Sequence, residues 1–89
     1  MSYKIFWHQE ALEDLKRLGK AEGLRIVDKM ESYLSASPKQ LGKALTGKFK
    51  GLFRYRMGKY RVIYTVKEEA VTVLVLRVGK RDEIYRLGA

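Results

Sequence analysis

Residues 52–64 read LFRYRMGKYRVIY and decide the fold, because they contain two runs of alternating side chains joined by a tight turn. Successive side chains of a strand point to opposite faces, so the runs Leu52–Met57 and Tyr60–Lys67 predict two β-strands. Gly58 stands first in the two-residue loop between them, where a type II′ hairpin needs a positive φ. The stretch therefore predicts an antiparallel hairpin.

A third run, residues 70–78, follows a predicted turn at Glu68-Glu69 and completes a three-stranded antiparallel meander. Its valines and leucines occupy both faces, which predicts a central or well-covered strand. At the other end of the chain, residues 2–8 are rich in aromatic and β-branched side chains and predict a first strand.

Two amphipathic helices are predicted between the first strand and the hairpin. Apolar residues recur at helical spacing up to Gly19, with acidic residues early and basic residues late, as the helix dipole favours. A second apolar stripe covers about residues 21–35, and Pro38 marks its end. Residues 37–51 are rich in Gly and Lys and predict an irregular loop. We therefore predict a single α+β domain over residues 1–89, ordered β-α-α-β-β-β, with a helical hairpin packed on one face of a twisted, mainly antiparallel sheet.

The composition excludes several kinds of site. The chain has no cysteine and a single histidine, His8, so a disulfide framework, a thiolate nucleophile and a histidine-based metal cage are not expected. The N-terminus lacks the apolar segment of a signal peptide, and no apolar run is long enough to cross a bilayer. We expect a cytoplasmic protein with no membrane contact, no metal and no small-molecule cofactor.

Positive charge is concentrated in the second half of the chain. The formal net charge is +9, and residues 46–89, with eleven basic and four acidic side chains, supply +7 of it. Such a surface favours a polyanionic partner and makes binding depend on salt. Charge alone does not choose between nucleic acid, an anionic membrane and an acidic protein.

Strand alternation places Arg54, Arg56 and Arg61 on one face of the predicted hairpin. Arginine makes bidentate contacts with phosphate, so this face predicts a platform for a phosphate backbone. The alternative is an ordinary solvated face, as antiparallel sheets often have. Residues 52–67 favour the platform, because they contain five basic residues and no acidic one, whereas a solubility face usually mixes both charges.

The hairpin resembles the core of the RelE-type toxins of the RelE/ParE superfamily. The first resembling block is Leu52–Tyr64, and the second, Val78-Gly79-Lys80-Arg81 with Tyr85 close behind, follows in the family's order. The segment Lys43-Ala44-Leu45-Thr46-Gly47 also resembles the family's approach to the first block. The resemblance thus covers nearly the whole chain.

This resemblance implies a metal-independent endoribonuclease that cleaves messenger RNA in the ribosomal decoding site by driving a 2′-hydroxyl onto the adjacent phosphate, and so inhibits translation. Preorganised cations would stabilise the developing negative charge. The implied catalytic residues are Arg54, Arg61, Arg81 and Tyr85. The RNA-binding candidates beside them are Arg56, Lys48, Lys50, Arg77, Lys80 and Arg86. Arg61 and Arg81 are both expected at the surface.

Two features depart from the family pattern. Arg54 and Arg56 stand where some relatives carry lysine, and arginine is a poor general base at neutral pH. Tyr85 can be the base, or the proton can leave to water; the sequence leaves both open. Tyr85 also lies only four residues after Arg81, and no long C-terminal helix follows, so its placement is expected to differ somewhat from that in other members. His8 receives no role from the resemblance and is not expected to act in catalysis.

Two other hypotheses stay open. A ParE-like module of the same fold inhibits DNA gyrase without chemistry, although gyrase-directed relatives tend not to keep the four implied catalytic residues together. A ribosome-associated RNA-binding domain would bind without cleaving. Either toxin hypothesis implies a cognate acidic, RelB-like antitoxin that covers the basic sheet, partly by folding on binding. The nuclease hypothesis adds the ribosome and messenger RNA as partners.

Overall fold

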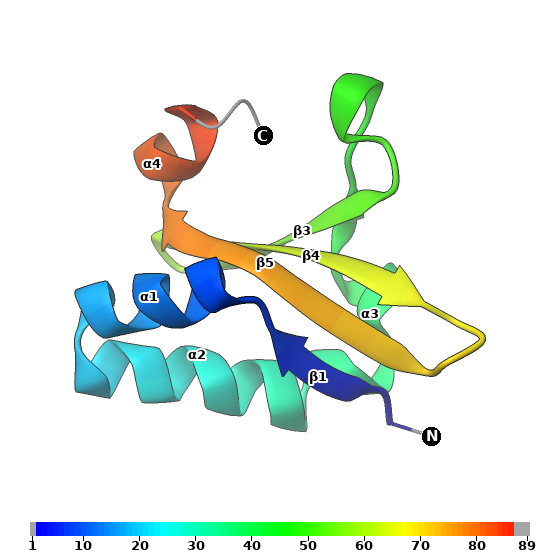
Figure 1. Cartoon of the computed structure of the whole chain (residues 1–89), viewed down its shortest axis with the longest axis horizontal. Coiled ribbons are helices and arrows are strands. Elements are labelled where there is room, and N and C mark those ends of the chain that lie inside the picture. Colours follow the sequence, from blue (N-terminus) through cyan, green and yellow to red (C-terminus); the bar gives the residue numbers. More distant parts are fainter. Residues whose placement is uncertain (1, 87–89) are drawn as a thin grey trace.

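The computed structural model of the protein describes residues 2–86 and contains one five-stranded sheet with helices on both sides (Figure 1). The strands lie in the order β1-β5-β4-β3-β2, and only the β1–β5 pair is parallel. The elements are β1 Lys4–Trp7, α1 Gln9–Leu18, α2 Lys20–Ser32, the 3-10 turn η1 Leu34–Ala36, α3 Pro38–Leu41, β2 Lys43–Ala44, the 3-10 turn η2 Gly47–Phe49, β3 Leu52–Met57, β4 Tyr60–Lys67, β5 Thr72–Lys80 and α4 Arg81–Arg86.

The predicted hairpin and meander are confirmed. Strands β3 and β4 begin and end at the residues that the alternation predicted, and Met57 lies opposite Tyr60. Gly58 has a φ of 60°, as the first position of the predicted turn requires. Strand β5 begins and ends two residues later than predicted and lies between β1 and β4, which explains why it is apolar on both faces.

The prediction of an irregular loop over residues 37–51 was wrong. This segment contains α3, η2 and the two-residue strand β2, which pairs with Phe53 and Arg54 of β3. Gly42 allows the chain to pass close to the core, because a Cβ at this position would collide with the Tyr64 hydroxyl. That hydroxyl is buried and donates a hydrogen bond of 2.6 Å to the carbonyl of Pro38.

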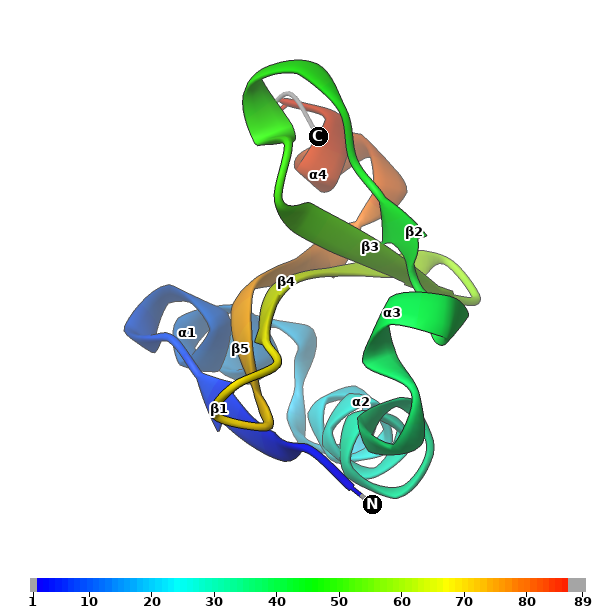
Figure 2. The same ribbon diagram turned by 90° about the vertical axis from the view of Figure 1, so that its right-hand side faces the viewer.

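The helical hairpin packs on one side of the sheet, as predicted. Helices α1 and α2 lie on one side, whereas α4 and the segment around η2 rise from the other (Figures 1 and 2). The core is formed by buried apolar side chains, namely Ala11, Ile26, Met30, Leu34, Tyr60, Val62, Tyr64, Val73, Val75 and Val78. Of the helices within residues 2–86, none is long and apolar enough to cross a membrane.

A buried carboxylate joins α1 to the second half of β5. Strand β1 pairs only with residues 72–75 of β5, and Asp14 of α1 meets the backbone further along, where it accepts the Val78 N–H at 2.9 Å. Asp14 is 2 % exposed and also accepts hydrogen bonds from Arg77 Nε at 2.8 Å and Arg17 Nη2 at 2.9 Å. Burial alone would raise the pKa of Asp14, but the hydrogen bonds from Arg77, the Val78 N–H and Arg17 outweigh it and lower the pKa.

We expect Asp14→Asn to lower the free energy of unfolding by roughly 2 kcal/mol, because hydrogen bonds to a charged acceptor are lost. Since the folded-state pKa of Asp14 is lowered, its contribution is present above the ordinary carboxyl value of about 3.9 and is lost as pH falls through the lowered folded value. Denaturant unfolding at neutral and acidic pH measures both effects. Glu13→Gln, at the exposed neighbouring position, is the control; equal loss in the two variants would contradict the prediction.

Candidate functional site

Four arginines and a tyrosine line one pocket on the side of the sheet opposite α1 and α2. Arg56 of β3 lies directly opposite Arg61 of β4, and Arg54 is two residues away on the same strand face. Arg81 and Tyr85 come from α4, which rises at the end of β5 (Figure 1). The five side chains enclose a hollow of about 140 Å³, called here the arginine pocket. The structure thus brings together all four implied catalytic residues and Arg56.

Arg61 forms the base of the arginine pocket. The expectation that it lies at the surface was wrong, because it is only 5 % exposed. Its Nη1 donates to the carbonyls of Gly58 and Tyr60, each at 3.0 Å, so the side chain also braces the β3–β4 turn. Gly79 of β5 lies beside Arg61 in the sheet and adds no side chain over it. Burial, followed by the charge of Arg56, lowers the pKa of Arg61, yet a guanidinium stays charged in proteins.

The arginine pocket is suited to binding an anion. The Nε atoms of Arg54 and Arg61 are buried and have no hydrogen-bond partner among the described residues. Among the described residues, no carboxylate lines the pocket. Buried polar groups are normally paired, and buried cations without counter-ions are costly. A phosphate group would supply both the acceptors and the negative charge that these guanidiniums lack.

Of the described residues that line the arginine pocket, Tyr85 is the one whose side chain can lose a proton more easily than a guanidinium. It is 46 % exposed, and the guanidinium carbon of Arg81 lies 5.1 Å from its ring centroid. Hydrogen bonding from Arg81, then the positive charges of Arg81, Arg54 and Arg61, lower the pKa of Tyr85 below its ordinary value of about 10. The ionised phenol is therefore more accessible here than in a free tyrosine.

Glu83 and Ile84 fix the position of α4, a helix that the sequence reasoning missed. Glu83 Oε1 accepts the Lys80 N–H at 2.8 Å, which is the reciprocal half of a capping box, and Ile84 is buried. Gly79 leaves room for the Glu83 side chain, since a Cβ at position 79 would lie only 3.2 Å from Glu83 Oε1. Two acidic residues, Asp82 and Glu83, directly after Arg81 were the available signal for a helix start.

The other predicted RNA-binding residues do not line the arginine pocket. Arg77 instead reaches α1, where its Nε and Nη2 bind Asp14. Lys80 is exposed and pairs with Tyr60 of β4. Because Tyr60 faces the core, Lys80 lies on that face of the sheet and not on the face of the arginine pocket. Lys48 lies in η2 and Lys50 directly after it, in the segment that rises on the same side of the sheet as α4 (Figure 2), and Arg86 is exposed at the end of α4.

His8 is a helix cap. Its Nδ1 accepts the Glu10 N–H at 3.1 Å at the start of α1, away from the arginine pocket. Within residues 2–86, no three His, Asp or Glu side chains gather in a way that would hold a metal ion.

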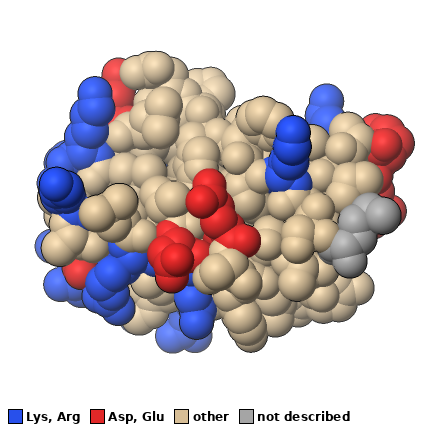
Figure 3. Space-filling model, turned by 90° about the horizontal axis from the view of Figure 1, so that it is seen from below, with Lys and Arg blue, Asp and Glu red and all other residues tan. Residues whose placement is uncertain are grey.

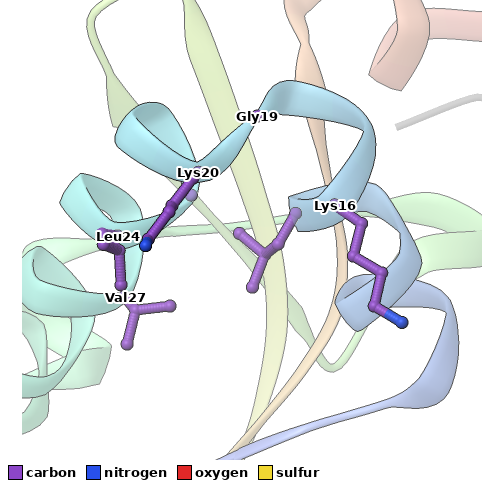
Figure 4. A pocket seen from close by; sticks show the side chains of 7 residues that line it. Lys16, Gly19, Lys20, Leu24 and Val27 are labelled. Atoms are coloured by element: carbon purple, nitrogen blue, oxygen red, sulfur yellow. The ribbon is translucent and has the colours of Figure 1, made fainter.

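A second hollow, of about 410 Å³, lies at the α1–α2 hairpin and is mainly apolar. Leu24 and Val27 face it from α2, and Lys16 and Lys20 extend along its rim (Figure 4). In the view of Figure 3, acidic side chains gather near the middle of the face, and basic side chains gather toward the end where α1 meets α2. This hollow lacks the clustered donors of the arginine pocket.

Comparisons with known proteins agree on one family. The sequence profile described as the ParE toxin of the type II toxin–antitoxin system parDE matches residues 5–85. Toxin RelG of Mycobacterium tuberculosis is 35 % identical over 97 % of this chain and 99 % of its own length, and toxin RelE of the same organism is 31 % identical over 96 % and 88 %. The crystal structure of the M. tuberculosis toxin–antitoxin complex RelBE2 matches with a TM-score of 0.87 and 32 % identity, covering 91 % of this chain and 93 % of that one. A mutant E. coli toxin RelE in the free state matches with a TM-score of 0.75 and 26 % identity, covering 97 % and 93 %.

Proposed function

This chain belongs to the RelE/ParE superfamily of type II toxins, and we propose that it is a ribosome-dependent endoribonuclease that cleaves messenger RNA and so inhibits translation. One observation carries the proposal. Among the described residues, the arginine pocket gathers four guanidiniums and a tyrosine and no carboxylate, and two of its buried Nε atoms have no hydrogen-bond partner. Such an arrangement suits a phosphate that gains negative charge during reaction.

In the proposed reaction the 2′-oxygen of a nucleotide forms a bond to its own 3′-phosphorus, and the bond from phosphorus to the 5′-oxygen of the next nucleotide breaks. The products are a 2′,3′-cyclic phosphate and a 5′-hydroxyl. Arg61 is held rigidly by the carbonyls of Gly58 and Tyr60, so it needs little reorganisation when the phosphorane charge develops. Arg54 and Arg81 approach the same hollow from β3 and α4 and add to this stabilisation.

We assign the general base to Tyr85. The other four residues lining the arginine pocket are arginines, which do not lose a proton at neutral pH. The lowered pKa of Tyr85 increases the fraction of phenolate that can accept the 2′-hydroxyl proton. The proton required by the leaving 5′-oxygen comes from solvent or from the protonated Tyr85.

An antitoxin is the proposed protein partner. The M. tuberculosis RelBE2 structure is a toxin–antitoxin complex, and the structure of an E. coli RelE mutant has been solved in complex with an antitoxin RelBc peptide. We propose that a RelB-like acidic segment covers the arginine pocket of this chain, because its four guanidiniums, which have no acidic neighbour among the described lining residues, attract carboxylates.

Gyrase inhibition is the second candidate, since the matching family profile is described as a ParE toxin. The same fold serves different functions, so the fold does not choose between them. The composition of the arginine pocket favours the nuclease.

The deciding experiment adds the purified protein to a defined cell-free translation reaction and maps the 5′ ends of the message by primer extension. Free RNA without ribosomes and a gyrase supercoiling assay run in parallel. We expect codon-phased cuts only on translating ribosomes. Intact message together with loss of supercoiling would replace the nuclease by the gyrase inhibitor, and binding to ribosomes without cuts would leave an RNA-binding domain.

A further inference from the structure

Two more hollows continue from the arginine pocket across strand β3. The first, the corner hollow, measures about 300 Å³ and is lined by Leu41, Gly42, Lys43, Arg54, Tyr55 and Arg56. The second, the edge hollow, measures about 440 Å³ and is lined by Arg25, Asp28, Lys29, Tyr55, Arg56, Met57 and Gly58. Arg54 and Arg56 line both the arginine pocket and the corner hollow, and Tyr55 and Arg56 line both the corner and the edge hollow. The shared lining residues therefore place the three spaces next to one another around β3.

This path is open because β2 is short. β2 pairs only with Phe53 and Arg54, so the outer edge of β3 from Tyr55 to Met57 carries no strand in the described chain. Alternation directs Arg56 to the face of the arginine pocket and Tyr55 to the face of the helices. A ligand that crosses this edge meets the arginine first and the tyrosine next.

The lining combines cations with aromatic rings. The corner hollow has three basic residues, Lys43, Arg54 and Arg56, and no acidic one. Beside the edge hollow, Tyr55 lies 6.4 Å from Tyr33 between ring centroids, and Lys29 Nζ lies 4.5 Å from the Tyr33 ring. Tyr33 is 45 % exposed, so its ring is available to a ligand. Grooves that bind single-stranded nucleic acid combine a basic track for the backbone with aromatic rings on which bases stack.

We propose that single-stranded RNA flanking the cleaved bond leaves the arginine pocket through the corner hollow, crosses the edge of β3, and stacks a base on Tyr55 in the edge hollow and on the neighbouring Tyr33. This inference rests on the proposed function for the identity of its ligand. It assigns binding roles to Lys29, Tyr33, Lys43 and Tyr55, none of which touches the reacting phosphate.

The chemistry favours RNA over a peptide strand at this edge. An added β-strand relies on backbone hydrogen bonds with pockets for alternate side chains. The corner hollow instead offers three cations and no acidic side chain. Asp28 is the one acidic residue in the edge hollow, against Arg25, Lys29 and Arg56, and Arg25 is paired with Glu22 at 2.9 Å.

The test measures fluorescence anisotropy of labelled 2′-O-methyl oligoribonucleotides, which bind but cannot undergo 2′-attack. One probe has about three nucleotides and extends little beyond the arginine pocket, and the other has about nine and reaches the edge hollow. At about 50 mM salt we expect the full chain to bind the longer probe about tenfold more tightly. Equal affinity for the two lengths would overturn the proposal.

Two double variants with the same change in charge make the test specific. The first, Lys29→Glu with Lys43→Glu, alters the proposed RNA track, which is the path through the corner and edge hollows. The second, Lys16→Glu with Lys20→Glu, alters the rim of the apolar hollow at the helical hairpin (Figure 4). We expect the first to lose most of the length-dependent affinity, roughly tenfold, and the second to keep it. Equal loss in both variants would mean that only net charge matters, and would overturn the track.

Tyr33→Leu tests base stacking separately. Because Tyr33 is exposed, we expect the variant to fold and to bind the longer probe about tenfold more weakly, with the shorter probe unchanged. The anisotropy assay measures binding of probes that cannot be cleaved, so its result does not depend on the outcome of the nuclease assay. If the track variants impair cutting on ribosomes while both probes bind as before, the surface contacts the ribosome or a protein and not the flanking message, and the proposal fails.

Discussion

Arg81→Ala is expected to slow cleavage of ribosome-bound message by about 10²- to 10³-fold, the range seen when one preorganised donor to a developing oxyanion is removed. Arg81 lines the arginine pocket, and its removal also takes away the largest influence that lowers the pKa of Tyr85. Both losses act on the chemical step. Single-turnover cleavage on programmed ribosomes, with the variant in excess, measures the effect directly.

The fold should survive this substitution. The Arg81 side chain is exposed, and the structural contact of the residue is its backbone N–H, which donates to the Lys59 carbonyl at 3.2 Å and is retained in alanine. Arg86→Ala is the comparison, because Arg86 is an exposed RNA-binding candidate on the same short helix outside the pocket lining, so its loss removes one positive charge without removing a pocket residue. Unchanged cleavage in Arg81→Ala, or a collapse of thermal stability, would contradict the assignment.

Arg61 is less suitable for this experiment because its side chain does two things. The hydrogen bonds from Nη1 to the Gly58 and Tyr60 carbonyls hold the β3–β4 turn, so replacement by alanine alters the turn as well as the pocket. The sequence showed which face of β4 carries Arg61. Its burial depends on the neighbouring α4 and on Gly79 of β5. Alternation within one strand cannot predict which residues of other elements lie next to it.

The meander was predictable because its signals are local. Alternating side chains and Gly58 define β3, β4 and the turn between them within sixteen consecutive positions, residues 52–67. The same alternation placed Arg54, Arg56 and Arg61 together, and the resemblance added Arg81 and Tyr85. Those five residues are the ones that line the arginine pocket.

The missed elements are too short to carry a periodic signal. β2 has two residues, α3 has four and α4 has six, whereas a helical stripe needs several turns to be visible. They form because of tertiary contacts, such as Gly42 beside Tyr64 and Ile84 in the core. Local propensity was not sufficient to predict them.

Arg77 illustrates a limit of reasoning from charge. It was grouped with the RNA-binding residues because it ends an apolar run near other basic residues, yet it binds Asp14, which is 63 positions away in sequence. The ladder between β4 and β5 also shifts register at Ile63 and Tyr64, directly beside Arg77. An ion pair of such long range and a bulge are both properties of the assembled sheet.

Tyr85→Phe is expected to slow cleavage by about 10²- to 10⁴-fold, the usual contribution of a positioned general base. The ring stays in place, so stacking and packing are kept while the ionisable hydroxyl is lost. A tyrosine acts as a base only when it is ionised, so the wild-type rate should rise with pH until the pKa of Tyr85, which Arg81 and its neighbours hold below about 10, and then level off.

The pH dependence separates Tyr85 from solvent as the proton acceptor. In Tyr85→Phe the rising limb that belongs to this residue should disappear, whereas Tyr3→Phe, at a position outside the arginine pocket, should keep the wild-type profile. Single-turnover rates across neutral to alkaline pH give both curves. If Tyr85→Phe cleaves slowly but retains the wild-type limb, the 2′-hydroxyl proton leaves to water and Tyr85 serves to position the nucleotide. The arginines would then supply nearly all of the chemical acceleration, because no other side chain lining the pocket gives up a proton in this range.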